Sequence, residues 1–215
     1  MIRLLIISIY ILFAADFVFA QSPQKYVTQG KNDPVKITYR QSGILKLQSR
    51  TAQATVDLRK DLDGCLRLFD GSVSTSRFTT DAISIRVLDE IIRGDKFFLV
   101  LQITTNGACN VQGMCGAGRE VAVYWFQFDA ALRREKFQHE LISSCRQSIA
   151  LEEPEDKHPE LQELKLKIKD GKLALQYEKY DYSHKENNKS FSLLYDRKAP
   201  ENGLLIKEDT KSKEK

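Results

Sequence analysis

Residues 105–120 (TNGACNVQGMCGAGRE) are the segment richest in residue types that could bind a ligand. They contain four of the eleven glycines of the chain and two of its four cysteines. Glycine lets a backbone approach a ligand closely and present its N–H groups. We therefore predict a ligand-binding loop whose contact residues are Asn110, Gln112, Arg119 and Glu120. The alternative is that the glycines only permit the turns, and that Arg119 pairs with a neighbouring acid.

The four cysteines predict two disulfide bonds. Four cysteines allow three pairings, and their proximity favours Cys109 with Cys115, which leaves Cys65 with Cys145. The alternative is a four-cysteine zinc site, but the close-set CxxC pairs of such sites are missing from the sequence. The sequence therefore predicts disulfides and no metal.

The remaining motifs do not predict a catalytic site. His139 and Glu140 begin a zinc-protease HExxH pattern, but Ser143 stands where the second histidine would be. A Cys145 nucleophile would be open to oxidation outside the cell. The glycine-rich residues 113–118 lead into a predicted strand and not into a helix, so they do not predict a phosphate site at a helix N-terminus. No cofactor is predicted.

Three surface features have a plain structural interpretation beside a functional one. Tyrosines gather near the C-terminus at Tyr177, Tyr180, Tyr182 and Tyr195; exposed rings can stack on sugars or proteins, but strand propensity favours packing in the core. The Arg93-Gly94-Asp95 adhesion tripeptide lies between two predicted strands and is expected to be a turn. Asn188-Lys189-Ser190 matches an N-glycosylation acceptor.

The loop of residues 105–120 joins two segments that are apolar at every position. These are residues 97–101 (FFLVL) and 121–126 (VAVYWF), and a strand covered on both faces has this pattern. A turn at residues 93–96 separates the first from another predicted strand, residues 83–92. Further strands are predicted at residues 35–39, 44–47, 191–195 and 204–206.

Residues 164–177 predict a β-hairpin. Leu164, Leu166 and Ile168 alternate with lysines, and Asp170-Gly171 is typical of a type I′ turn. A two-residue loop would oppose apolar side chains in three pairs, namely Ile168 with Leu173, Leu166 with Leu175 and Leu164 with Tyr177. Two segments stay ambiguous between helix and strand: residues 51–63, where strand is favoured, and residues 130–145.

Residues 1–20 have the features of a secretory signal peptide. Arg3 is followed by an apolar run, and Val18 and Ala20 stand where a signal peptidase reads small residues. The alternative is an uncleaved membrane anchor, but the run is shorter than the roughly 20 apolar residues of a membrane span. We therefore expect cleavage before Gln21, a periplasmic or extracellular location, and no stable transmembrane span.

Composition and pattern together predict an all-β, mainly antiparallel sandwich or barrel with room for one short helix. The expected parts are a signal peptide (1–20), a flexible segment (21–34), one β-rich domain (35–206) and a disordered charged tail (207–215). The net charge of +4 comes from 33 basic and 29 acidic residues without a long basic run. Nucleic acid is therefore not an expected partner.

The function that the sequence favours is binding. We expect an exported module that contacts another protein, an envelope polymer or a small ligand, with its site at the loop of residues 105–120. The alternative is a cell-envelope hydrolase whose carboxylates come from separate strands, where their spacing in the sequence cannot reveal them. Two carboxylates in one cleft would favour that enzyme.

Overall fold

The computed structural model describes residues 24–27, 34–40, 43–58, 83–106, 119–144, 147–151, 166–184 and 187–209. Within these residues, three antiparallel sheets of four strands each follow one another along the chain. The prediction of a mainly antiparallel β protein is confirmed. No helix in the described ranges is long and apolar enough to cross a membrane.

Each sheet is a meander of consecutive strands. The N-terminal sheet comprises β1 (Gln24–Val27), β2 (Lys36–Arg40), β3 (Ile44–Gln48) and β4 (Gln53–Asp57). The middle sheet comprises β5 (Ile83–Arg93), β6 (Lys96–Asn106), β7 (Arg119–Phe128) and β8 (Arg134–Ser143). The C-terminal sheet comprises β9 (Ile149–Leu151), β10 (Lys172–Lys179), β11 (Lys189–Asp196) and β12 (Leu205–Asp209), with the 3-10 helix η6 (Pro200–Asn202) before its last strand.

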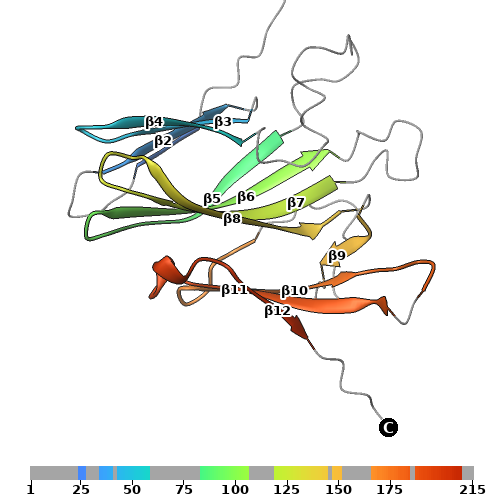
Figure 1. Ribbon diagram of the computed structural model, residues 1–215. Coiled ribbons are helices and arrows are strands. Elements are labelled where there is room, and N and C mark those ends of the chain that lie inside the picture. Colours follow the sequence, from blue (N-terminus) through green and yellow to red (C-terminus); the bar gives the residue numbers. More distant parts are fainter. Residues whose placement is uncertain are drawn as a thin grey trace, which may run out of the picture.

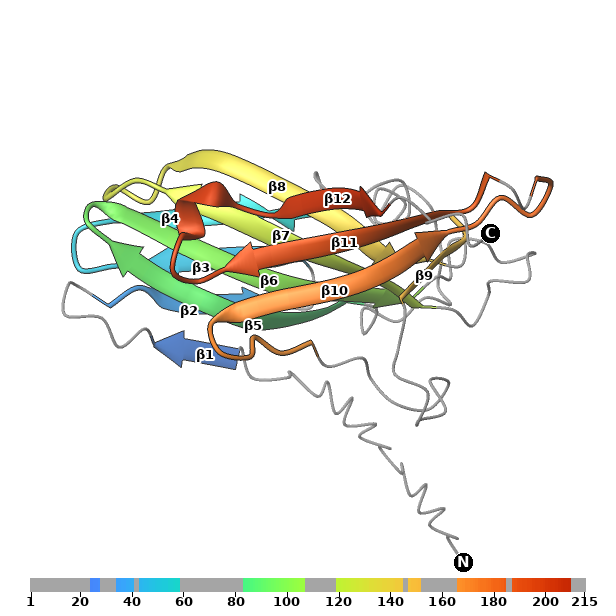
Figure 2. The same ribbon diagram turned by 90° about the horizontal axis from the view of Figure 1, so that it is seen from below.

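The three sheets stack as layers, and the middle sheet lies between the other two (Figures 1 and 2). Its strands β6 and β7 send alternate side chains into two separate cores. Leu99, Leu101 and Phe126 pack toward the N-terminal sheet, whereas Val100 and Trp125 pack toward the C-terminal sheet. Both faces of these strands must therefore be apolar, which explains why residues 97–101 and 121–126 lack polar alternation.

The predicted hairpin over residues 164–177 is wrong beyond its turn. Asp170 and Gly171 have positive φ angles of 51° and 77°, as a type I′ turn requires, but among residues 166–177, which the structure describes, only Lys169 and Lys172 bridge across it. Strand β10 pairs instead with β11 over eight residues and with β9 over three. Tyr177 is thus opposite Phe191 and Leu151.

The segment before that turn does not join β10 because it runs to the middle sheet. The Leu166 N–H donates to Oε1 of Gln102 on β6 at 3.1 Å, and the Leu166 side chain packs in the core between the middle and C-terminal sheets. Alternation correctly indicated which face of β10 is buried, because Leu173 and Tyr177 are both buried. It did not identify the neighbouring strand.

Each of the two ambiguous segments contains a strand. Residues 53–57 form β4, and residues 134–143 form β8. Strand β1 lies inside the segment expected to be flexible and pairs with β2, and β12 extends to Asp209. Gly94 has a φ of 61° in the β5–β6 turn, so the Arg93-Gly94-Asp95 tripeptide forms the predicted turn.

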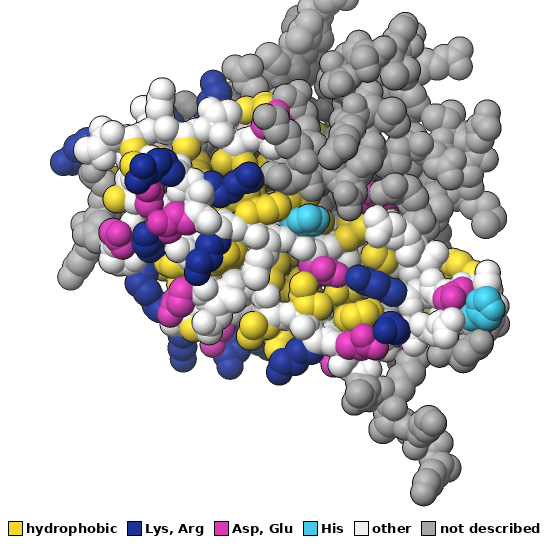
Figure 3. Space-filling view, in the orientation of Figure 1, with side chains coloured by type: hydrophobic (Ala, Val, Ile, Leu, Met, Phe, Trp, Pro, Cys, Tyr) yellow, Lys and Arg dark blue, Asp and Glu magenta, His cyan; other side chains and the backbone are white. Residues whose placement is uncertain are grey.

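Charged side chains of both signs are mixed over the face shown in Figure 3. Some charged side chains form exposed ion pairs across neighbouring strands, as Lys189 of β11 does with Glu208 of β12 at 3.0 Å. Exposed pairs of this kind contribute at most about 1 kcal/mol each to stability.

Candidate functional site

The loop of residues 105–120 leaves and rejoins the middle sheet at one end of the sandwich, hereafter the loop end. Asn106 at the end of β6 is opposite Arg119 at the start of β7. The predicted contact residues Asn110 and Gln112 and all four cysteines (Cys65, Cys109, Cys115 and Cys145) lie outside the described residues. Of Arg119, the structure describes the backbone.

Glu120 is a buried carboxylate at the base of this loop. The Ser144 hydroxyl donates to its Oε1 at 2.9 Å, and the Gln147 backbone N–H donates to that hydroxyl at 3.1 Å. Ser144 itself is fully buried. These contacts join the start of β7 to the turn that follows β8, so Glu120 is placed to hold the base of the loop.

The turn after β8 connects this base to a second feature of the loop end. Ser144 and Ile149 exchange backbone hydrogen bonds of 2.9 and 2.8 Å. The Ser148 carbonyl, inside the turn, accepts the Tyr180 N–H at 2.8 Å. The tip of the β10–β11 hairpin therefore lies beside the turn that contacts Glu120.

This hairpin tip, residues 180–184 with 187 and 188, displays two tyrosine rings. Tyr182 is 79% exposed, more than any other large hydrophobic side chain in the described ranges. The Tyr180 and Tyr182 rings are 6.3 Å apart between centroids and inclined by 18°. The predicted core position of the tyrosines is correct for Tyr177 and Tyr195 and wrong for Tyr182.

Hydrogen bonds within the tip hold its backbone. The Asp181 carboxylate accepts the N–H groups of Ser183 and His184 at 2.9 and 3.1 Å, and the Asn187 amide at 3.3 Å. The Asn187 hydrogen bond, followed by the backbone ones, lowers the pKa of Asp181. The Asn188 Oδ1 atom accepts the Asp181 N–H at 2.9 Å. These hydrogen bonds connect the described residues of the tip on either side of Tyr182.

A second polar cluster lies between the middle and C-terminal sheets. The Tyr177 hydroxyl donates to Oε1 of Glu140 at 2.6 Å, and Lys179 Nζ donates to the same oxygen at 3.1 Å. Burial, followed by the Glu140 contact, raises the pKa of Tyr177. Because the Tyr177 side chain is fully buried, we interpret this cluster as a connection between β8 and β10.

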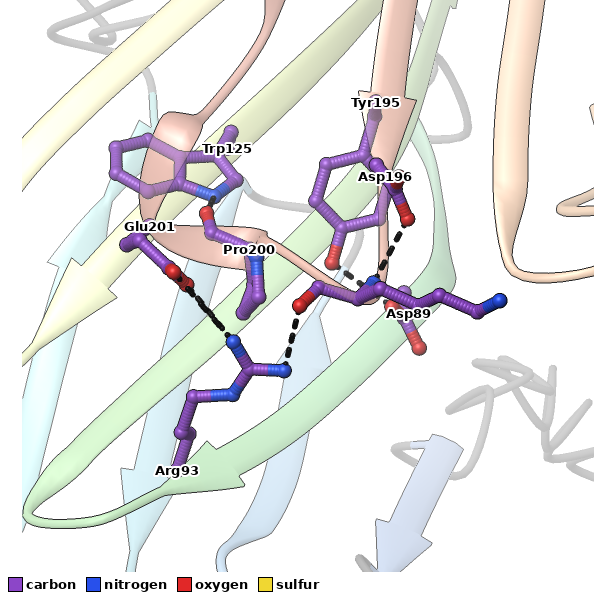
Figure 4. A network of polar contacts seen from close by, with 8 residues as sticks. Asp89, Arg93, Trp125, Tyr195, Asp196, Pro200 and Glu201 are labelled. Carbon is purple, nitrogen blue, oxygen red and sulfur yellow. Dashed lines mark hydrogen bonds and ion pairs between the residues drawn. The ribbon is translucent and has the colours of Figure 1, made fainter.

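A third cluster connects the same two sheets near η6 (Figure 4). The Tyr195 hydroxyl donates to buried Asp89 at 2.8 Å, and burial, followed by Asp89, raises the pKa of Tyr195. Nearby, Arg93 donates to Glu201 at 3.2 Å and to the Lys198 carbonyl at 2.7 Å. The guanidinium of the adhesion tripeptide is therefore engaged within the fold.

Asp89 and Glu90 do not form the carboxylate pair that would favour a hydrolase. Asp89 is opposite Val100 and Glu90 is opposite Leu99, and those two residues belong to different cores. Successive residues of a strand point to opposite faces, so the two carboxylates do not converge. In the described part of the chain, no group of three or more His, Cys, Asp or Glu could hold a metal ion.

Glu90 yields a prediction about the pH dependence of stability. Its Oε2 atom is buried and makes no hydrogen bond within the described structure, and burial, followed by Asp89, raises its pKa while Arg197 lowers it. A raised pKa means that the ionised carboxyl opposes folding, so this cost is absent below about pH 4 and grows as pH rises. We expect Glu90→Gln to raise the melting temperature at pH 8 by a small amount, because solvent screens this half-buried group, and to match wild type at pH 3.5.

Thermal unfolding followed by circular dichroism across this pH range would test the prediction. Glu208→Gln is the matched control, because this exposed carboxylate only pairs with Lys189 and its loss should change little. A Glu90→Gln variant less stable than wild type at pH 8 would refute it.

The far end of the sandwich, across the length of β6 and β7, carries a small pocket. Its volume is about 190 Å³, and its lining includes Thr51, Asp95 and Phe97. Pockets for drug-sized ligands are about 300–1,000 Å³, so this one is small. It lies roughly 30 Å from the loop end, given the rise of about 3.3 Å per strand residue.

Comparison of the chain with protein families, with curated proteins and with solved structures found no match.

Proposed function

We propose that the protein is an exported binding protein that contacts its partner through the loop end of the sandwich. The observation that carries this proposal is the position of the loop. It connects β6 and β7, whose residues 97–105 and 120–128 are all buried. Binding residues are typically displayed on loops that a rigid scaffold positions.

Within the loop we assign the contacts to Asn110, Gln112 and Arg119. Glu120 supports them, because its carboxylate accepts a hydrogen bond from buried Ser144 at 2.9 Å. The partner is a protein, an envelope polymer or a small ligand reached after export. Glycines at Gly107, Gly113, Gly116 and Gly118 would let the loop backbone approach it closely.

A triple variant tests the proposed site. We expect Asn110→Ala with Gln112→Ala and Arg119→Ala to keep wild-type stability within about 0.5 kcal/mol, as exposed substitutions usually do. The same variant should recover much less partner from envelope extract in a pull-down. The control is Thr51→Ala with Asp95→Ala at the far end, which should recover partner like wild type. Equal recovery by the triple variant and wild type would contradict the proposed site.

Export yields a separate prediction. The charged start, apolar run and small residues of positions 1–20 are the features that a signal peptidase recognises. Protein recovered from the producing cells should begin at Gln21, in free or cyclised form, when its N-terminal peptide is identified by mass spectrometry. Protein that retains Met1 in the membrane fraction would contradict export.

A further inference from the structure

We propose that the hairpin tip is an oligosaccharide-binding element, in which Tyr182 stacks on a sugar ring and polar side chains of the tip bind its hydroxyl groups. This inference rests on the proposed function, because it names a ligand class for the same end of the sandwich. It adds a contact surface of described residues to the loop of residues 105–120.

The hairpin tip, the end of β6 and the start of β7 lie at the same end of the layers (Figures 1 and 2). The Tyr180 N–H is bonded to Ser148 at 2.8 Å, and Ser144 of the same turn is bonded to Glu120 at 2.9 Å. The tip and the base of the loop therefore belong to the same end of the sandwich and are joined through the turn that follows β8.

Tyr182 is a large aromatic side chain that is exposed at the tip. An exposed hydrophobic side chain gains nothing from burial in the folded monomer, and Tyr182 is 79% exposed. The hydrogen bonds of Asp181 and Asn188 fix the turn beneath it. A backbone held in this way would lose less conformational freedom on binding than an unconstrained one, which favours affinity.

Polar side chains surround the two tyrosine rings of the tip. Ser183, His184 and Asn187 are exposed beside the tyrosines, and Asp181 supplies a carboxylate whose side chain is 39% exposed. A sugar ring has an apolar C–H face that packs on an aromatic ring, and its hydroxyls bond to carboxylate, amide and imidazole groups.

A protein partner fits this surface less well. Stable protein interfaces bury about 800 Å² on each partner around an apolar centre. Among the described residues, the other large hydrophobic side chains that are exposed are Leu205 and Ile206 of β12. They belong to another strand and not to the tip, so the tip offers two rings among polar groups.

A titration tests the proposal with the mature chain labelled with ¹³C in its tyrosine rings. Chitohexaose, cellohexaose and a hyaluronan hexasaccharide are added separately at 150 mM salt, and the ring signals are followed by NMR. We expect the Tyr182 signal to shift with at least one of these sugars. Tyr182→Ala should weaken the Kd of that sugar by at least about tenfold, and Tyr182→Phe, which keeps the ring, by less than about threefold.

Leu205→Ala is the matched control, because Leu205 is an exposed large side chain of the same sheet outside the tip. It should bind like wild type. The proposal is overturned if none of the three sugars shifts the Tyr182 signal, or if Tyr182→Ala binds like wild type. Capture of a protein at Tyr182 without any sugar binding would equally overturn it.

The loop triple variant separates this inference from the proposed function. If Tyr182→Ala loses sugar binding and the triple variant keeps it, the result would support a binding site at the tip and contradict one at the loop. Lost partner binding in the triple variant, with unchanged binding in Tyr182→Ala, would support the loop and contradict the tip.

Discussion

Trp125→Ala is expected to lower the free energy of unfolding by about 3–5 kcal/mol, the usual cost of removing a buried aromatic side chain. Trp125 is 1% exposed and packs beside Phe98 in the core between the middle and C-terminal sheets. Its indole N–H also donates to the Pro200 carbonyl at 3.0 Å (Figure 4). The substitution therefore removes both apolar contact and a hydrogen bond between two layers.

Urea unfolding would measure this loss, and Trp125→Phe would divide it into two parts. The phenylalanine variant keeps most of the ring but loses the hydrogen bond, so its stability should lie between wild type and Trp125→Ala. Amide exchange should accelerate more in β10 and β11 than in β2 and β3, because Trp125 faces the C-terminal sheet. A loss below about 1 kcal/mol would contradict the packing described for Trp125.

The second large effect is expected from the long-range disulfide that we propose between Cys65 and Cys145. Closing a loop of this length stabilises by about 4–5 kcal/mol in the chain-entropy account, against about 2 kcal/mol for the short Cys109–Cys115 loop. Cys65→Ser with Cys145→Ser should therefore destabilise more than Cys109→Ser with Cys115→Ser. Chemical unfolding of both double variants would give the ranking.

Non-reducing peptide mapping would test the pairing itself. The expected products join Cys109 to Cys115 and Cys65 to Cys145. The proposed disulfides would be contradicted by free thiols in the native protein, by bound zinc in stoichiometric amount, or by any other pairing.

The buried strands could be predicted from sequence because burial dictates their composition. Residues 97–101 and 121–126 are apolar at every position, which only a strand covered on both faces tolerates. The pattern does not indicate how many layers cover it. The three sheets stack because Leu99 packs in one core and Val100 in the other, on opposite faces of the middle sheet. Each core also contains residues that are distant in the sequence, so a local pattern does not reveal it.

Partner choice could not be predicted for β10. Period-two alternation specifies the buried face of a strand, and any alternating neighbour can cover it. Residues 164–168 were the nearest candidate, but β11 offers eight paired residues. The contact of Leu166 with Gln102 depends on the middle sheet, so no local pattern indicates it.

The candidate site was predicted in part. The two apolar segments predicted a strand on each side of the loop, and the base of the loop does lie between β6 and β7. Ser144 was not singled out, and Tyr182 was considered as an exposed ring but was expected in the core. A useful signal was available for Tyr182, because it lies beyond the last alternating position of β10, whereas Tyr177 lies within the alternation.

The most direct test of the proposed binding site is site-specific photo-crosslinking in the cells that produce the protein. A photoreactive amino acid is placed at Gln112 of the loop or Tyr182 of the tip, and at Asp95 or Arg133 at the far end, where both side chains are largely exposed. We expect crosslinked products, to a protein or an envelope polymer, from Gln112 and Tyr182 and not from the far end. Products formed only from Asp95 or Arg133 would contradict it.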